Sequence, residues 1–581
     1  MRRYLYSLLG TLTGIWLSVI LGVVLVILLV TSAMSGKDIV IKDNSVLRIE
    51  LSGVACDRTM PVDRLDAIYG TASRQFPVND VVSSIRRAKT DSRISGIYLD
   101  CQGLSIGLAQ AQAIREALAD FKDSGKWVVA YSDNYTQAEY FIATEADDLC
   151  LNKIGMVDVH GLSATTFYFK DFLDKIGVKA QVVKVGTYKS AVEPFILNDM
   201  SEANREQQQH FLGAMWNTVA SRIAGSRGVG VDAVNVWADS YSFTRNPQYY
   251  VEQQMVDSLL YRHEMEDFIS GLTDSDKMSS VDYQDYVSVT SDSPKTGKSV
   301  CIAVLYALGD ITESADGGIS SEVYVPEILD LAGREEIDGL VMRVNSGGGS
   351  AFASEQIWEA LEEFKRISGK PYYVSMGDMA ASGGYYISCG ADRIYAEELT
   401  LTGSIGIFGI IPDIDGLLSG KLGINTSRVA TNESSLPDLF KPMSPGLRDA
   451  MQQYVDRGYE LFVTRCAEGR GVTYDEIAAV AEGRVWDGAS ALKHNLVDKL
   501  GGLDMALADM TEALKADSYT TVSYPAVMLS VWDAIAEMST REDMSSMLKE
   551  RLGQSYMYYD MINRFGSMHP LQCRMDFISV K

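Results

Sequence analysis

A serine flanked by very small residues is the first place in this sequence where chemistry can be expected. It is Ser382, in the motif ASGG. The apolar run Tyr372–Met376 before it is typical of a buried strand, and Tyr385 and the residues after it can begin a helix. A serine at such a turn can attack a substrate, because small neighbours let the substrate approach and helical amides face the charge that forms. The alternative is a tight turn with a capping serine.

Three consecutive glycines follow another predicted strand. The strand covers Leu340–Val344, and the glycines belong to the motif NSGGGS at Asn345–Ser350. Glycines after a buried strand let backbone amides turn towards a ligand and let that ligand come close. We therefore expect the amides of Gly348 and Gly383 to form an oxyanion hole with two donors. The alternative is a phosphate cradle, but the motif TGKS has Asp292 where a P-loop needs glycine.

A serine nucleophile needs a base, and the sequence offers a lysine rather than a histidine. Lys189 lies among small and apolar residues in KVGTYKSAVEPF. A lysine accepts a proton near neutrality only if its pKa falls by about three units from 10.4, which burial can achieve. Glu193 would raise that pKa, so we expect its carboxylate to point away. The alternative is a solvated loop lysine. None of the histidines lies in a motif with an orienting acid: His160, His210, His263, His494 and His569.

These turns belong to two copies of one sequence pattern. The segment SGIYLD at 95–100 matches DGLVMR at 338–343, and the predicted helix at 111–126 matches the one at 354–370, about 245 residues apart. Strand and helix signals alternate in both copies, which predicts an α/β fold with largely parallel sheets. The first copy lacks the serine turn and the three glycines, and the second has no lysine matching Lys189. A single site divided between two repeats would leave this pattern.

Composition excludes several classes of function. The chain has 581 residues, of which 22% are charged, as expected for a folded protein of several domains. Its net charge of −25 argues against nucleic-acid binding, because phosphates would be repelled. The seven cysteines are scattered without a C-x-x-C motif, which predicts neither a disulfide framework nor a zinc site. No histidines stand at metal-ligand spacing, so we expect no metal and no cofactor.

The N-terminal segment has the character of a membrane anchor. No charged residue occurs from Tyr4 to Gly36, and Ile15–Val30 is almost continuously apolar, long enough to span a bilayer as a helix. Arg2 and Arg3 precede it, which predicts a cytoplasmic N-terminus and places the bulk of the protein on the other side. The alternative is a cleaved signal peptide, whose apolar region is usually only about 7–15 residues.

Four segments together resemble the long-form signal peptide peptidase A family, the membrane-anchored serine proteases of family S49. They are GTYKSAVEPF, NSGGGS, MAASGGYYIS and LTGSIGIFG. The resemblance extends over roughly residues 45–515, in order and in both copies. One departure is Gly347, where the family pattern usually has proline, which loosens the loop but leaves its amides available.

The resemblance implies a ClpP/crotonase-like fold in each repeat and a Ser/Lys dyad. In this dyad Ser382 is the nucleophile, Lys189 is the general base and Ser404 hydrogen-bonds the lysine to orient it. Gly348 and Gly383 supply the oxyanion amides. The resemblance further implies a homotetrameric bowl on the bacterial inner membrane, with its bulk in the periplasm, that degrades cleaved signal peptides and other apolar peptides.

We therefore expect an anchor at 1–36, a lysine-bearing repeat at 37–297, a serine-bearing repeat at 298–517 and a helical tail at 518–581. The predicted function is that of a membrane-anchored serine endopeptidase. Two alternatives belong to other classes. A crotonase-like acyl-CoA enzyme would share the oxyanion hole without needing the Ser/Lys pair or the anchor, and a non-catalytic membrane scaffold would need neither residue.

Overall fold

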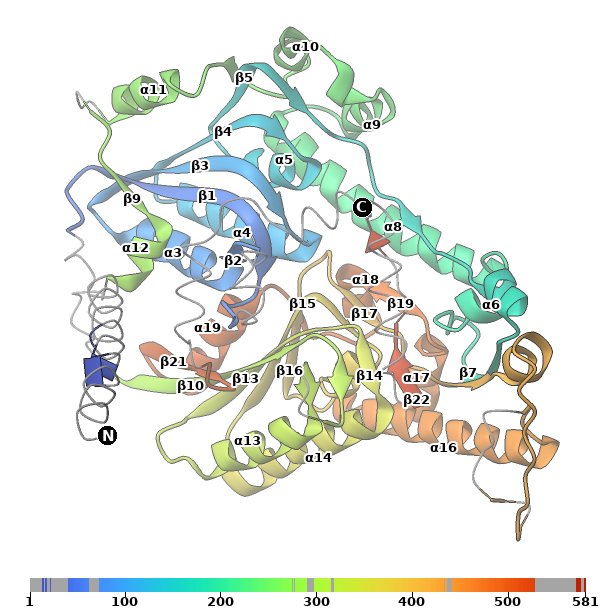
Figure 1. Ribbon diagram of the computed structural model, residues 1–581. Helices are drawn as coiled ribbons and strands as arrows, with labels where there is room; N and C mark the ends of the chain where they lie inside the picture. The colour runs from blue at the N-terminus through green and yellow to red at the C-terminus, as the bar shows by residue number, and fades with distance from the viewer. Residues whose placement is uncertain are drawn as a thin grey trace, which may run out of the picture.

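The structure is a computed structural model that describes residues 13–14, 16–17, 21, 40–61, 73–273, 275, 277–289, 297–314, 318–432, 434–435, 441–527, 571–575 and 579–580. Within these residues the chain forms two α/β repeats, and in Figure 1 the first repeat (blue to green) lies above the second (yellow to orange). The expected α/β class with two repeats is confirmed.

The first repeat is built on a parallel sheet in the order β2-β1-β3-β4-β5-β8, and β9 also pairs with β1. Its strands are β1 (Ser45–Cys56), β2 (Gln75–Pro77), β3 (Ile94–Ser105), β4 (Trp127–Tyr135), β5 (Asp148–Val157), β8 (Ser258–Leu259) and β9 (Ser280–Asp282). The helices are α3 (Val78–Thr90), α4 (Leu108–Lys122), α5 (Gln137–Ala143), α6 (Lys170–Ile176), α7 (Glu193–Ile196), α8 (Glu202–Arg227), α9 (Val231–Asp239), η1 (Ser242–Thr244), α10 (Pro247–Glu252), α11 (Glu264–Leu272) and α12 (Tyr283–Ser288).

The second repeat has a sheet in the order β19-β17-β15-β13-β10-β21, with β16 joining β15 to β20. Its strands are β10 (Ser299–Leu308), β13 (Gly339–Ser346), β15 (Tyr372–Ala381), β16 (Arg393–Ala396), β17 (Leu401–Gly403), β19 (Val485–Asp487), β20 (Lys499–Leu500) and β21 (Ser518–Tyr524). The helices are α13 (Ser321–Gly333), α14 (Ala351–Ser368), α15 (Gly383–Tyr386), η2 (Gly416–Lys421), α16 (Pro445–Arg470), α17 (Tyr474–Val480), α18 (Gly488–Lys493) and α19 (Leu503–Ala513).

A third sheet joins the two repeats. Its order is β12-β11-β14-β22-β18-β7, formed by β7 (Lys179–Val185), β11 (Ile311–Thr312), β12 (Ile319–Ser320), β14 (Gly348–Ser350), β18 (Ile407–Asp413) and β22 (Leu571–Arg574). Strand β7 comes from the first repeat and pairs along its whole length with β18 of the second (Figure 1). A short ladder of β6 (Ala164–Thr165) with β23 (Ser579–Val580) lies apart from these sheets.

Matching hydrogen bonds recur in both repeats and show that the duplication is structural. The hydroxyl of Tyr140 donates to the carbonyl of Met255 at 2.8 Å, and in the second repeat Tyr385 donates to the carbonyl of Leu496 at 3.0 Å. The ion pair of Arg227 with Asp257 at 2.7 Å likewise has a counterpart of 2.5 Å between two residues of the second repeat, Arg470 and Asp498. Both repeats therefore anchor the long helix and the tyrosine helix in the same way.

The expected boundary at residue 518 differs from the structure. Ser518–Tyr524 is a strand, β21, that pairs in parallel with β10 as β9 pairs with β1. Its sequence SYTTVSY is rich in β-branched and aromatic residues, which is the strand signal that the helical-tail prediction overlooked. The helices expected at 531–538 and 544–552 lie outside the described residues.

The anchor predicted at Tyr4–Gly36 lies almost wholly outside the described residues. Positions 13, 14, 16, 17 and 21 are described, and they are helical. Among the residues that the structure does describe, no helix combines the length and the apolar character needed to cross a bilayer.

The repeats also meet through a half-buried carboxylate on β15. Oδ1 of Asp378 accepts the amides of Ala109 and Gln110 at 3.0 and 3.2 Å, so a side chain of the second repeat caps helix α4 of the first. Burial and the neighbouring charge of Asp57 raise the pKa of Asp378 to about 6. A carboxylate that is costly to bury therefore lies at the contact between the repeats, four residues before Ser382.

Candidate active site

The two residues predicted to react lie side by side although 193 positions separate them. Nζ of Lys189 lies 2.7 Å from Oγ of Ser382 and donates to it. Lys189 is 1% exposed and Ser382 is 0% exposed, so the contact is shielded from solvent. Both belong to the same chain, one from each repeat. A buried lysine on a serine hydroxyl can take the serine proton when the amine is neutral.

Ser404 holds the lysine from a second side. Nζ of Lys189 donates to the backbone carbonyl of Ser404 at 3.0 Å and to its Oγ at 3.1 Å. Three oxygen partners therefore surround the amine, and two of them belong to one residue. The orienting role of Ser404 that the resemblance implies stays a prediction, with which these contacts agree.

The backbone at Ser382 is strained in the way that a nucleophile turn requires. Ser382 has φ 57° and ψ −114°, a conformation that residues with a side chain rarely adopt. Its amide donates to the carbonyl of Gly403 at 2.7 Å, which ties the turn to strand β17. The next residue, Gly383, begins helix α15, so its amide is one of those that have no partner within the helix.

The loop after β7 delivers Lys189 into the second repeat. The antiparallel pairing of Val185 with Ile407 brings the end of β7 to the start of β18, a few residues beyond Ser404. The amide of Tyr188 then donates to the carbonyl of Glu482 at 2.9 Å. Gly483 has φ 78°, and a Cβ there would lie 2.6 Å from the backbone nitrogen of Lys189, so this close approach requires glycine.

Glu193, the carboxylate that could have opposed a neutral lysine, is used elsewhere. It accepts bonds from the hydroxyl of Ser201 at 2.5 Å and from Nδ2 of Asn204 at 3.1 Å, at the first turn of α8. An acidic side chain at a helix N-terminus is favoured by the unpaired amides there. The prediction that Glu193 points away from Lys189 agrees with this arrangement.

The glycine loop lies beside the serine turn. Gly348 has φ 100°, its amide donates to Oγ of Ser346 at 3.1 Å, and a Cβ on Gly384 would lie 2.7 Å from the carbonyl oxygen of Ser346. Gly349 pairs with Ile311, where a Cβ would lie 2.1 Å from the carbonyl oxygen. Only glycine fits this crowded contact, which explains the repeated glycines.

The histidines take other places. His210 and His494 pack against the ring of Trp486 with centroids 5.9 and 4.2 Å away, and His263 stacks on Tyr261. Among the described residues no group of three or more His, Cys, Asp or Glu side chains is arranged to hold a metal ion. The groups that the structure places around Ser382 are the amine of Lys189 and the backbone of the two turns.

Known proteins share this organisation in sequence. The model of peptidase family S49 matches residues 120–268 and 364–517, one segment in each repeat. Protease 4 of Haemophilus influenzae is 34% identical over 542 residues, covering 90% of this chain and 88% of the relative. The chain belongs to peptidase family S49. Lys189 lies in the first matched segment, and Ser382 and Ser404 lie in the second.

Two further relatives support the assignment of this peptidase to family S49. Protease 4 of Salmonella typhi is 36% identical over 519 residues, 84% of this chain and 82% of the relative. The chloroplastic serine protease SPPA of Arabidopsis thaliana is 28% identical over 484 residues, 81% of this chain and 69% of the relative. Among solved structures, a ClpP1 mutant from Listeria monocytogenes has a TM-score of 0.24 and 15% identity, covering 34% of this chain and 91% of that chain, a likeness too slight to decide the fold. The expectation of a serine protease is confirmed.

The first repeat of the peptidase keeps a closed copy of the glycine turn. Gly103 has φ 90° and corresponds to Gly348, 245 residues later. Here, however, Oε1 of Glu139 accepts the amides of Gly103 and Leu104 at 2.7 and 3.1 Å. The second repeat has Gly384 in the place of Glu139. In the first repeat an internal carboxylate therefore occupies the amide of Gly103, which corresponds to the proposed oxyanion donor Gly348, and the amide that follows it.

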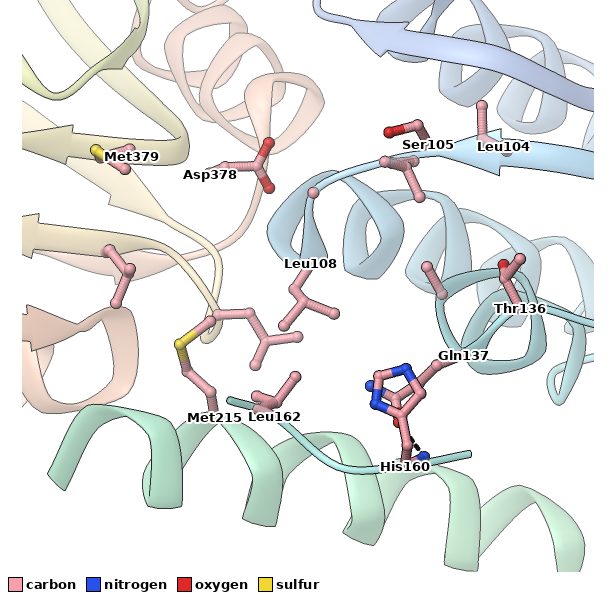
Figure 2. Close-up of a pocket in the computed structure, with 15 residues that line it drawn as sticks. Leu104, Ser105, Leu108, Thr136, Gln137, His160, Leu162, Met215, Asp378 and Met379 are labelled. Atoms are coloured by element: carbon pink, nitrogen blue, oxygen red, sulfur yellow. Dashed lines mark hydrogen bonds between the residues drawn. The ribbon is translucent and has the colours of Figure 1, made fainter. Parts of the chain in front are cut away.

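A cavity of about 390 Å³ lies at this closed copy, between the repeats (Figure 2). Its walls are mostly apolar, with Leu104 and Leu108 from the first repeat, Met215 from α8 and Met379 from β15. Ser382 and Lys189 do not line it, but Met379 lies on the strand that leads to Ser382. This cavity thus lies next to strand β15 rather than at the contact of Lys189 with Ser382.

The C-terminal segment of the peptidase also lies at the site, which the sequence does not predict. Strand β22 pairs antiparallel with β14, where Arg574 lies opposite Gly348, and with β18, where Gln572 lies opposite Phe408. The amide of Met575 donates to the carbonyl of Gly347 at 2.8 Å, and Met575 is 3% exposed. No periodic or motif signal marks these residues in the sequence, because their partners lie more than 150 residues away.

The dyad geometry predicts non-additive loss of activity. Replacing Ser382 by Ala, or Lys189 by Ala, should each lower kcat by at least about 10⁴-fold, and the double variant should be no worse, because residues that act as one unit lose their effect together. Hydrolysis of an apolar peptide ester, measured beside thermal melting, tests this. A well-folded Lys189→Ala variant with substantial activity would show that another group is the base.

Proposed function

We propose that this peptidase hydrolyses apolar peptides with Ser382 as nucleophile and Lys189 as general base. The observation that carries the proposal is the 2.7 Å contact between Lys189 Nζ and Ser382 Oγ, buried and made by residues of two different repeats. A structural hydrogen bond would not need a lysine held by three oxygens beside a serine in a strained turn.

The proposed reaction begins with proton transfer. Neutral Lys189 takes the proton of Ser382 as Oγ attacks the scissile carbonyl carbon, and the resulting ammonium gives that proton to the leaving amine. A water molecule, deprotonated by the same lysine, then attacks the acyl-enzyme, and the ammonium returns the proton to Oγ of Ser382 as the carboxylic acid leaves. Ser404 keeps Nζ aligned through both steps. The amides of Gly348 and Gly383 stabilise the oxyanion, and loss of one such donor costs about 3 kcal/mol of transition-state stabilisation.

The position between β14 and β18 in the third sheet suits a substrate in the extended conformation of a strand. Both strands offer backbone groups to a strand placed between them, and β22 of the same chain lies there. An added strand gains affinity from main-chain hydrogen bonds and specificity from alternate side chains. Buried Met575 belongs to the same apolar cluster as Ala381 and Leu401, next to the nucleophile turn. Peptides with apolar side chains therefore fit this surface.

Two alternatives from the sequence remain distinct. A crotonase-like acyl-CoA enzyme would use the amides without the lysine, and a scaffold would use neither. Membership of peptidase family S49 favours proteolysis over both. A fluorophosphonate probe, which forms a stable adduct only with an activated serine, separates the three functions.

The probe should label the purified chain on Ser382 alone, and Ser382→Ala should abolish labelling. The same chain should turn over leucine-rich peptides at least about ten times faster than charged peptides of equal length, because a single methylene group in an apolar pocket is already worth about 1–3 kcal/mol and an unpaired charge buried there costs more. Mass spectrometry of the adduct and peptide assays give both results. An unlabelled chain, or a preference for the charged set, contradicts the proposal.

We further propose that residues 4–36 anchor a homotetramer in the bacterial inner membrane, where its substrates are cleaved signal peptides. The support is the uncharged N-terminal segment and the resemblance to a signal-peptide-degrading family. A substrate released into the bilayer is apolar, which agrees with the apolar surroundings of Met575.

A reporter active only outside the cytoplasm, fused after residue 581, should be active, and a cytoplasmic reporter should be silent, because Arg2 and Arg3 hold the N-terminus inside. The mass in detergent should be four times the 63.8 kDa of one chain. The opposite reporter pattern, or a monomer mass, would overturn the corresponding part of the proposal.

Removing residues 571–581 should lower KM about tenfold with little change in kcat, because a tethered strand competes with substrate at high effective concentration. The free peptide LQCRMDFISVK should inhibit the truncated chain. Met575→Asp, which keeps the chain length but disfavours burial of the segment, is the matched variant and should act in the same direction. An unchanged KM in both variants would show that β22 does not compete with substrate.

A further inference from the structure

The strand that carries the nucleophile is bulged just before Ser382. Strands β13 and β15 run in register until Val344 pairs with Met376, and the next pair is Ser346 with Ala380. One residue of β13, Asn345, therefore lies opposite three residues of β15, 377–379. A bulge bends its strand and re-aims the side chains that follow, so the direction of Ser382 depends on how this bulge is held.

The side chain of Asn345 spans the bulge. Its Oδ1 accepts the amide of Met379 at 3.2 Å, a residue that has no partner in the β13–β15 ladder and pairs with Leu401 of β17 on the other side. A Cβ on Gly377 would lie within 2.9 Å of the Asn345 side chain, so glycine makes room for it. Asn345 also begins the loop that presents Gly348, so one side chain joins the nucleophile strand to the glycine loop.

Arg343 holds the other end of the bulge. Its Nη1 donates to Oγ of Ser375 at 2.8 Å and to the carbonyl of Met376 at 2.7 Å. Arg343 thus contacts β15 just before residues 377–379 and Asn345 contacts the last of them. Both side chains bond to one partner from the first repeat, Asp57. Oδ1 of Asp57 accepts Nε of Arg343 at 2.7 Å, and Oδ2 accepts Nδ2 of Asn345 at 3.0 Å.

We propose that Asp57 is a positioning residue of the first repeat, which holds the bulge at 377–379 and thereby sets the direction of Ser382 and the glycine loop. The inference rests on the proposed function of Ser382. Asp57 touches none of the reacting atoms and acts through Asn345 and Arg343. Its two oxygens accept from Arg343 and Asn345, and Oδ2 also accepts from Nε2 of Gln110 at 3.4 Å, whereas asparagine has one accepting oxygen and an apolar side chain has none.

The burial of the ion pair between Asp57 and Arg343 indicates a role beyond stabilising the fold. The side chains of Asp57 and Arg343 are each 2% exposed. A buried ion pair is usually no more stabilising than apolar residues of the same volume, because desolvation offsets the attraction. Such a pair does fix one geometry. At this site the geometry is that of the strand leading to the nucleophile, and it depends on the first repeat.

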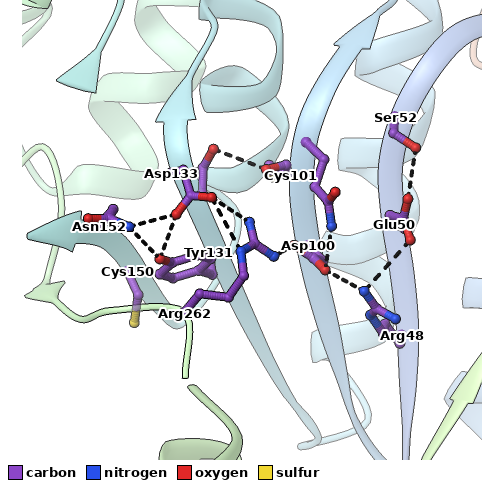
Figure 3. Close-up of polar contacts among 12 residues, drawn as sticks. Arg48, Glu50, Ser52, Asp100, Cys101, Tyr131, Asp133, Cys150, Asn152 and Arg262 are labelled. Carbon is purple, nitrogen blue, oxygen red and sulfur yellow. Dashed lines mark hydrogen bonds and ion pairs between the residues drawn. The ribbon is translucent and has the colours of Figure 1, made fainter. Parts of the chain in front are cut away.

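The first repeat supplies a matched control, Asp100, which corresponds to Arg343 when SGIYLD is aligned with DGLVMR. Asp100 is 1% exposed and pairs with Arg48 at 2.6 Å and Arg262 at 2.8 Å (Figure 3). Both partners belong to its own repeat. A change at Asp100 therefore removes a buried carboxylate from its ion pairs, whose arginines are partly exposed, without touching β15 or the glycine loop.

The experiment tests three chains: Asp57→Asn, Asn345→Ala, and a double variant that combines Asp57→Leu with Arg343→Met. The reference chains are Asp100→Asn and the wild type. The double variant removes both charges, so neither is left buried and unpaired. We expect kcat on the peptide ester and the rate of fluorophosphonate labelling to fall about 100-fold in the first three chains, with KM changed less than about threefold, because misplacement of reacting groups costs rate more than binding. Asp100→Asn should lose melting temperature but keep the wild-type kcat per folded molecule.

Wild-type kcat in folded Asp57→Asn and in the double variant would overturn the inference, and so would an equal loss of kcat in Asp100→Asn. If Asp57→Asn does not fold, the double variant and Asn345→Ala decide. A wild-type chain that is neither labelled nor active refutes the proposed function instead, so the two failures are distinguishable.

Discussion

The contact between a lysine of one repeat and a serine of the other is the constraint that explains most of this architecture. Nζ of Lys189 and Oγ of Ser382 are 2.7 Å apart, so the two repeats must meet to within a fraction of an ångström. The antiparallel pairing of β7 with β18 sets the approach of the lysine loop. On the other side, the carboxylates of Asp57 and Asp378 cross between repeats in opposite directions. Each repeat therefore completes what the other cannot form alone.

Electrostatics at this interface follow from burial. Asp378 is held by two helical amides, yet burial and the charge of Asp57 raise its pKa to about 6. Arg343 offsets part of this charge by its ion pair with Asp57. A carboxyl with a raised pKa favours the folded chain most below about pH 4, its ordinary pKa, and that contribution is lost as the pH rises through about 6. The contact between the repeats is thus set by geometry at some cost in charge burial.

The sequence was enough to predict the elements whose signals are local. The duplication, the alternation of strands and helices, and the end of α14 at Gly369, which has φ 62°, all follow from periodicity and glycine placement. Comparing the two copies also singled out Ser382 and Lys189, which the structure brings together. The sequence does not predict the contacts of Asp57 and of strand β22. The partners of Asp57 are 286 and 288 residues away, those of β22 are more than 150 residues away, and no local pattern marks either of them. The sequence predicts Asn345 only as part of the glycine loop, because a side chain that bridges a bulge leaves no periodic pattern.

The carboxylate of Glu139 has a consequence for the history of the two copies. Besides filling the amides of Gly103 and Leu104, Glu139 completes a capping box with Thr136 at the start of α5. Replacing it by glycine would open those amides but remove a helix cap that contributes about 1 kcal/mol. No nucleophile would gain from the open amides, because Gln137 stands in the serine position. The first substitution towards a second active site would therefore lower stability without giving activity. This keeps the two repeats different from each other.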